Sequence, residues 1–142
     1  AAADLAGFDL KEILKRDLQA AGHDVLDLGT KTAQSVDYPD FGTAMADALA
    51  SGRAAKGVLV CGTGIGISIA ANRNPKVRAA LVHDVTSARL SRQHNDANVV
   101  AFGQRLIGTE TAREALKVFL DTRFEGGRHA GRVAKLSKGC TT

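Results

Sequence analysis

The stretch VLVCGTGIGISIA, residues 58–70, decides how this sequence folds. An apolar run ending in a cysteine predicts a buried strand, and three glycines at alternate positions then predict a tight turn into an apolar helix. Glycine has no side chain to keep a ligand away from the backbone N–H groups. A strand, a glycine turn and a helix in this order therefore predict an anion-binding turn, with Cys61 at its entrance.

Short apolar runs alternate with helical segments on both sides of this turn, a pattern typical of parallel α/β sheets. We expect one domain over residues 1–142, with a first strand that is short or truncated at Ala1. Its fold is predicted as a doubly wound, Rossmann-like sheet of five parallel strands with flanking helices and a basic C-terminal helix. The expected strands are residues 1–4, 25–28, 57–61, 78–83 and 98–102; the expected helices are 8–21, 38–49, 64–72, 86–93, 109–120 and one from Arg128.

Composition narrows the classes of function. A hydrophobic content of 44% and a charged content of 24% are ordinary for a soluble globular protein. No apolar run approaches the roughly 20 residues that cross a bilayer, so we expect no membrane segment. Two cysteines and no export leader favour a reducing cytoplasm. The net charge of +4 fits a small anionic ligand, whereas an aromatic content of 4% argues against stacking on nucleic acid.

The glycine turn fits neither common nucleotide motif. A dinucleotide site needs G-x-G-x-x-G, and here the third glycine, Gly66, comes one position too early; no G-K-[ST] follows either. The turn can still hold a phosphate or an oxyanion that develops during a reaction. A thiolate beside a helix start is stabilised, which makes Cys61 a usable base or nucleophile. The alternative is a small buried side chain that ends a strand.

Two further clusters carry candidate chemistry. In residues 89–105, His94 and Asn95 precede a strand and Arg105 follows it; they offer acid–base and anion-binding groups, or the first two simply cap a helix. Arg128 and Arg132 are four apart, so they share a helix face that can hold a phosphate, or they form a solvated basic face. Because no H-x-x-x-H, C-x-x-C or carboxylate cluster appears, we expect no metal ligation.

Parallel sheets place ligands beyond the carboxyl ends of their strands. That rule selects Asp4, Cys61 with its glycines, the loop after His83, and residues 103–105.

Together these segments resemble the type B ribose-5-phosphate isomerases and their galactose-6-phosphate isomerase relatives. The matching pieces are AADLAGFDLK (2–11), DYPDF (37–41), GVLVCGTGIGISIAANR (57–73), SARLSRQHNDANVVAFGQR (87–105) and FEGGRHAGRV (124–133). They occur in family order and span nearly the whole chain.

The resemblance implies a cytoplasmic aldose–ketose isomerase without metal or cofactor that converts ribose 5-phosphate to ribulose 5-phosphate through an enediolate. It also implies a homodimer or a dimer of dimers with shared active sites. Cys61 is then the base, His94 assists opening of the furanose ring, and Thr63 belongs to the catalytic turn. The residues implied in substrate binding are Asp4, Leu5, Tyr38, Gly62, Gly64, Ile65, Gly66, Asn95, Arg105, and, from the partner subunit, Arg128 and Arg132.

Leu5 departs from the family pattern, which commonly has histidine at this position. The loss of a polar contact predicts a shifted preference, toward a four- or six-carbon sugar phosphate. Two rival hypotheses remain: a non-catalytic phosphate- or nucleotide-binding module that has kept the fold, and a nucleic-acid binder driven by the net positive charge.

Overall fold

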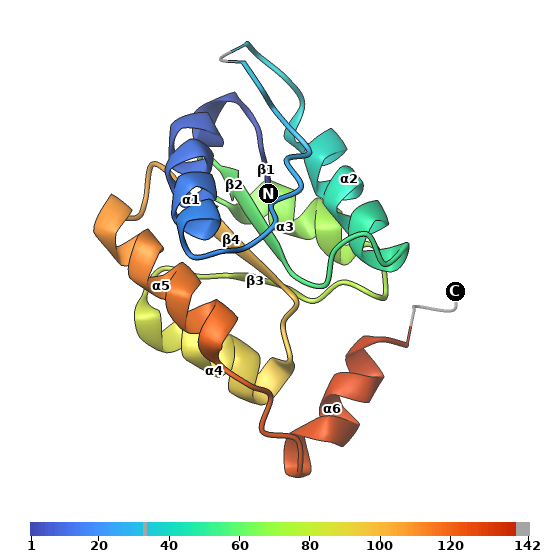
Figure 1. Cartoon of the computed structure of the whole chain (residues 1–142). Helices are drawn as coiled ribbons and strands as arrows, with labels where there is room; N and C mark the ends of the chain where they lie inside the picture. Colours follow the sequence, from blue (N-terminus) through green and yellow to red (C-terminus); the bar gives the residue numbers. More distant parts are fainter. Residues whose placement is uncertain (33, 139–142) are drawn as a thin grey trace.

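The computed structural model describes residues 1–32 and 34–138 of the chain. Within them, one parallel sheet forms with its strands in the order β1-β2-β4-β3 (Figure 1). The strands are β1 (Ala2–Ala3), β2 (Gly57–Cys61), β3 (Ala79–Leu81) and β4 (Val99–Gly103). In the register, Cys61 lies opposite Gly103, so β2 and β4 end at the same edge. The parallel α/β architecture agrees with the prediction.

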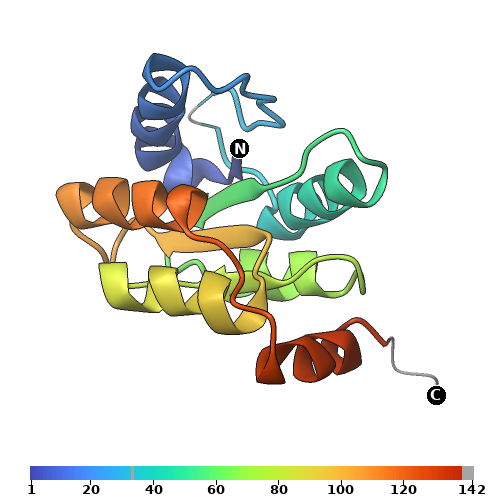
Figure 2. The ribbon, with the colours of Figure 1, turned by 60° about the horizontal axis from the view of Figure 1, so that its bottom comes forward.

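Helices cover both faces of the sheet, as Figure 2 shows. They are α1 (Phe8–Ala20), α2 (Tyr38–Ala50), α3 (Ile65–Asn72), α4 (Val85–Asn95), α5 (Thr109–Asp121) and α6 (Arg128–Leu136), with a short 3-10 helix, η1, at Leu5–Gly7. Helices α1, α4 and α5 pack on one face, and α2 and α3 on the other. Helix α6 projects from the body of the chain beyond α4. None of the helices in the described part is long and apolar enough to cross a membrane.

The side chains of β2 alternate between the two faces, as the period of a strand requires. Val58 and Val60 belong to the core shared with α1, α4 and α5. Leu59 and Cys61 belong to the core shared with α2 and α3. The sulfur of Cys61 therefore lies on the same side of the sheet as α3, the helix that begins after the glycine turn.

The fifth predicted strand, residues 25–28, does not form in the described part of the chain. Its segment does run beside β1, since the Leu28 N–H donates to the Ala1 carbonyl at 2.9 Å and the Ala3 N–H donates to the Gly29 carbonyl at 2.8 Å. However, Gly29 has a φ of 105°, and its N–H donates to the Asp27 carboxylate at 2.9 Å. This local turn ends the extended backbone before a ladder develops, and the apolar pattern alone did not reveal it.

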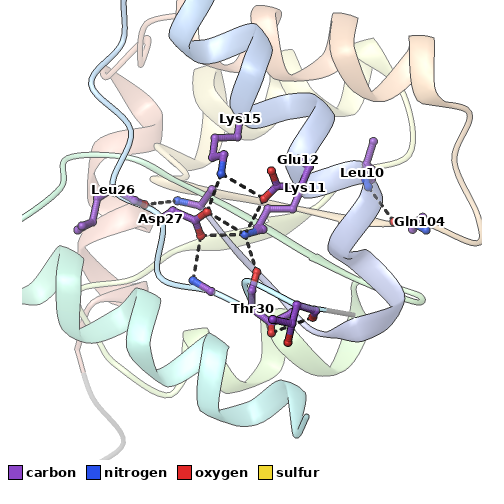
Figure 3. Close-up of polar contacts among 11 residues, drawn as sticks. Leu10, Lys11, Glu12, Lys15, Leu26, Asp27, Thr30 and Gln104 are labelled. Carbon is purple, nitrogen blue, oxygen red and sulfur yellow. Dashed lines mark hydrogen bonds and ion pairs between the residues drawn. The ribbon is translucent and has the colours of Figure 1, made fainter. Parts of the chain in front are cut away.

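A buried ion-pair network holds this segment against α1 (Figure 3). Lys11 is fully buried, and its Nζ donates to the Asp27 carboxylate at 2.8 Å and to the Thr30 carbonyl at 2.7 Å. Lys15 donates to the same carboxylate at 2.9 Å. Burial would raise the pKa of Asp27, but the hydrogen bonds from Lys11, Lys15 and the Gly29 N–H outweigh it and hold that pKa well below its usual range.

Two differences in helix bounds affect the site. Helix α4 extends to Asn95 instead of ending at residue 93, so His94 and Asn95 are its last two residues. It closes on Asp96, whose φ is 46°. Helix α3 starts at Ile65, with Gly64 as the residue that precedes it.

Candidate active site

The turn after β2 closes around the sulfur of Cys61. The Gly64 N–H donates to Sγ at 3.0 Å, and the side chain is only 4% exposed. The Ile65 N–H donates to the hydroxyl of Thr63 at 3.2 Å. Helical geometry gives the N–H groups of Gly66 and Ile67 no acceptor within α3. These donors form a concavity of partial positive charge beside a thiol, an arrangement that stabilises a thiolate or a nearby oxyanion.

Two glycines are required by the packing of this turn. Gly64 has a φ of 77°, and a β-carbon there would lie 2.5 Å from Leu81 and 2.8 Å from the backbone of Phe102. A β-carbon on Gly103 would overlap the backbone of Thr63. The turn is thus pressed onto the end of β4, where the Gln104 N–H donates to the Cys61 carbonyl at 2.9 Å. The conformation of the turn is fixed by its neighbours on two strands.

Several other predicted residues lie around the same turn. Tyr38 is the first residue of α2, and its ring packs directly on Gly66. The Arg105 Nε lies 3.5 Å from the position that a β-carbon on Gly62 would take. The backbone N–H of Arg105 donates to the Gly62 carbonyl at 3.0 Å. Asp4 follows β1 and caps η1, accepting from the Gly7 N–H at 3.1 Å. The structure therefore brings together Asp4, Tyr38, Cys61, Gly62, Thr63, Gly64, Ile65, Gly66 and Arg105 at the carboxyl edge of the sheet.

Leu5 opens η1 beside Asp4 and is 42% exposed. The neighbouring Ala6 lies against Gly62, since a β-carbon there would be 3.5 Å from the Ala6 methyl. Leu5 thus adds an apolar, solvent-facing side chain to this edge, where Ile65 is also exposed.

The remaining predicted residues lie at the opposite edge. Helix α4 runs back from the end of β3 and finishes just before β4 starts, which puts His94 and Asn95 where the parallel strands begin. The length of β2, five residues, separates the two edges by about 13 Å along the strand. Within one chain, His94 does not meet Cys61.

His94 belongs to a second group of residues, which we call the α4–α6 corner: His94, Glu125, Arg128, His129 and Arg132. The rings of His94 and His129 stack with their centroids 4.4 Å apart, and His129 is 7% exposed. Arg128 Nε lies 3.4 Å from His129 Nε2, and Arg132 is exposed one turn further along α6. Burial, then the positive potential of His94 and Arg128, lowers the pKa of His129.

A buried arginine that the sequence reading did not single out holds this corner in place. Arg92 donates from Nη1 to the Asp96 carboxylate at 2.8 Å and to the Ala97 carbonyl at 2.6 Å. Its Nε donates to the Thr122 carbonyl at 3.1 Å, and the Glu125 N–H donates to the Gln93 carbonyl at 3.1 Å. The connection from α5 to α6 is therefore fastened to α4. His129 lies four positions after Glu125, but Arg92 lies 30 positions before Thr122, a distance at which sequence spacing carries no signal.

Comparison with known proteins shows the family to which the chain belongs. The family model described as Ribose/Galactose Isomerase matches residues 1–136. The chain belongs to the ribose/galactose isomerase family. Within this family, it is 44% identical over 134 residues to the ribose-5-phosphate isomerase B of Escherichia coli, covering 94% of this chain and 90% of that protein.

Two further members of the ribose/galactose isomerase family bear on fold and substrate. The solved structure of Clostridium thermocellum ribose-5-phosphate isomerase B superposes with a TM-score of 0.95 at 45% identity, covering 96% of this chain and 93% of that one. The D-erythrulose-4-phosphate isomerase of Pectobacterium atrosepticum is 42% identical over 135 residues, covering 94% of this chain and 89% of that protein. Members of similar identity to this chain thus act on sugars of different length.

Proposed function

We propose that the chain is a sugar-phosphate isomerase that interconverts ribose 5-phosphate and ribulose 5-phosphate, with the Cys61 thiolate as the base. The observation that carries this proposal is the hydrogen bond from the Gly64 N–H to Cys61 Sγ at 3.0 Å, inside a turn of backbone donors. Membership of the ribose/galactose isomerase family supports the reaction class.

The chemistry requires a base and an anion site side by side. In the open-chain aldose, the thiolate removes the hydrogen on C2, a C1–C2 double bond forms, and O1 becomes an enediolate oxygen. The thiol then returns the hydrogen to C1, and the proton of O2 passes to O1, which leaves the ketose. Because that C–H is a weak acid, the site must stabilise the anion more than the reactant. The free N–H groups at the start of α3 would do this, at about 3 kcal/mol per well-placed donor.

In this proposal Arg105 holds the phosphate, which is supported by its Nε lying beside Gly62 at the same edge. Asp4 and Tyr38 flank the turn and would contact the sugar hydroxyls. A reduced sulfur is essential to this scheme, which suits the reducing cytoplasm expected from the cysteine usage.

The position of His94 leads us to propose a homodimer with shared sites. His94, Asn95, Arg128 and Arg132 would complete the Cys61 site of the partner, since their own lies at the far edge of the sheet. This widens the expectation from the sequence, in which only the two arginines crossed to the partner. A two-fold dimer forms both composite sites at once.

The first experiment replaces the base. Cys61→Ser should lower kcat for ribose 5-phosphate by about 10³-fold, because serine is a far weaker base and general base catalysis is worth 10²–10⁴. The measurement is formation of ketose by the purified full chain, with Cys140→Ser as the matched thiol control. Cys61→Ser protein that keeps most of its turnover would end the proposal.

The second experiment tests the shared site. Cys61→Ser and His94→Gln homodimers should each be nearly inactive. Mixing them under conditions of subunit exchange should restore about a quarter of wild-type activity, because half the dimers are mixed and each of these has one intact site. If both catalytic groups act within one chain, mixing restores nothing.

The third experiment determines which sugar phosphate the chain prefers, since Leu5 stands where the family commonly has histidine. It compares kcat/KM for four-, five- and six-carbon aldose phosphates. A relative acting on D-erythrulose 4-phosphate shows that a four-carbon substrate is compatible with 42% identity. Leu5→His should move kcat/KM toward the five-carbon sugar if the apolar side chain sets the preference. An unchanged ranking would show that Leu5 does not set it.

A further inference from the structure

The α4–α6 corner gathers three metal-ligating side chains from separate parts of the chain. One ligand atom each from His94, Glu125 and His129 lies within 4.8 Å of the other two. We infer that this corner binds a divalent transition-metal ion, with Zn²⁺ as the first candidate, at a site separate from the Cys61 turn of the same chain. Two imidazoles and one carboxylate are a donor set that zinc uses when a fourth position stays open.

The geometry is close to what such an ion needs. Zinc bonds of about 2.1 Å place neighbouring tetrahedral donors roughly 3.4 Å apart. His129 Nε2 and Glu125 Oε2 are already 3.7 Å apart. The Glu125 side chain is 49% exposed, so it can move to complete the site. The two histidine rings are stacked 15° from parallel, so they must rotate until their nitrogen lone pairs converge on the ion.

The backbone around these three residues is well supported. The His129 N–H donates to the Gly126 carbonyl at 3.0 Å, and the Glu125 N–H donates to the Gln93 carbonyl next to His94. Arg92 fastens the start of the same connection through the Thr122 carbonyl. A metal ion would therefore bind to side chains whose backbone positions are fixed beforehand, which reduces the entropy lost on binding.

The positive charges of Arg128 and Arg132 limit how tightly the corner can bind a metal ion. Arg128 lies 3.4 Å from the Nε2 of His129 that the metal would use, and Arg132 follows on the same helix. Both guanidinium groups repel a cation, so Arg128, which is exposed, must turn away on binding. An anion held by the two arginines would reduce this repulsion, and linkage then requires metal and anion to strengthen each other's binding.

Occupation of the site would have a consequence for the reaction, and this step rests on the proposed function. A metal ion bound to a ring nitrogen of His94 removes the lone pair needed to accept a proton. Zinc should therefore act as a reversible inhibitor, relieved by a chelator.

Cobalt provides the direct test, because Co²⁺ absorbs visible light weakly with six ligands and strongly with four. Full-length protein titrated with Co²⁺ at neutral pH in phosphate-free buffer should develop the intense spectrum at one equivalent per chain and lose it on addition of Zn²⁺. Glu125→Gln and His129→Gln should weaken Co²⁺ binding at least tenfold. His23→Gln, which changes an exposed histidine outside the corner, should leave it unchanged.

Three results would overturn the inference. One is a pale six-coordinate spectrum, and another is an intense spectrum unaffected by Glu125→Gln, a surface change that does not threaten folding. The third is a near-ultraviolet thiolate-to-cobalt band that is lost in Cys61→Ser, which would place the metal at the sulfur. These results are independent of turnover. Metal-free protein without isomerase activity would instead contradict the proposed function and leave the cobalt result intact.

Discussion

The two edges of the sheet differ in how their functional residues are held. At the carboxyl edge, one segment of seven residues, 61–67, supplies the thiol and its donors, and neighbouring strands leave no room for a β-carbon at Gly64 or Gly103. At the amino edge, His94, Glu125 and His129 come from two helices and a connection, and Arg92 joins these through side-chain bonds. The first group is local in sequence and rigid; the second depends on tertiary contacts. Under the proposed function, catalysis that uses both groups would need two copies of the chain.

The largest expected effect tests the amino edge. His94→Gln should lower kcat for ribose 5-phosphate by about 10³-fold, because ring opening loses its acid–base group. The loss should be small for a four-carbon aldose 4-phosphate, whose esterified O4 cannot close a furanose ring. Both rates come from the same ketose assay on purified variant.

The control for this pair of substrates is His23→Gln, which should leave both rates unchanged. Equal losses on the two substrates would show that His94 acts in the isomerisation step itself, and the division of labour between the edges would then be wrong.

The second prediction concerns the rigidity of the carboxyl edge. Gly64→Ala should lower the free energy of unfolding by roughly 3 kcal/mol, since the new methyl group adds overpacking against Leu81 and Phe102 to the cost of a positive φ. Gly52 has a similar φ of 78° but no atom within 4 Å of its β-carbon position. Gly52→Ala should therefore cost only about 1 kcal/mol.

Chemical denaturation of both variants measures these two values. Equal losses in the free energy of unfolding would mean that backbone strain alone explains the effect of Gly64→Ala. The contact with β4 would then not restrain the turn.

The third prediction concerns the ion pair of Lys11 and Asp27, which belongs to neither group of functional residues. Asp27→Asn should cost about 2 kcal/mol at pH 7, because it leaves the buried Lys11 with only the Thr30 carbonyl and Glu12 as partners. The pKa of Asp27 is lowered in the folded chain, so its contribution is complete above the unfolded value of about 3.9 and is lost as the pH falls below it.

Thermal unfolding at pH 7 and pH 3 measures the difference between wild type and Asp27→Asn, which should shrink at the lower pH. Asp17→Asn, which removes a charged partner of the exposed Arg113, should cost less than about 1 kcal/mol. A difference that grows on acidification would contradict the assigned ion pair.

What the sequence revealed follows the same division between local and distant contacts. Strand β2 was predicted with its observed bounds, and α3 within one residue, because an apolar run and a glycine turn are local signals. The strand predicted at residues 25–28 failed, since an aspartate side chain bonding two residues ahead competes with ladder formation.

Which residues meet at each edge of the sheet depends on the order of the strands and on where the helices end. The carboxyl-edge rule correctly placed Asp4, Cys61 and Arg105 beside one another, because parallel strands end together. No spacing rule placed His94 at the opposite edge or joined it to Glu125, since that depends on where α4 ends and how α6 returns. The expectation of no metal ligation relied on short motifs, which do not detect a set such as His94 with Glu125, 31 positions apart; it stays a prediction, which the cobalt titration tests.

Side chains along β2 point alternately to the two faces of the sheet. The face on which the Cys61 sulfur lies therefore depends on whether the number of residues before it in the strand is odd or even. Adding one residue to β2 would turn the thiol toward α1 and α5, where it becomes one more small apolar group. Adding two would return it to the side of α3. A deletion or insertion series through this strand should thus switch activity off and on by parity, even where every variant folds.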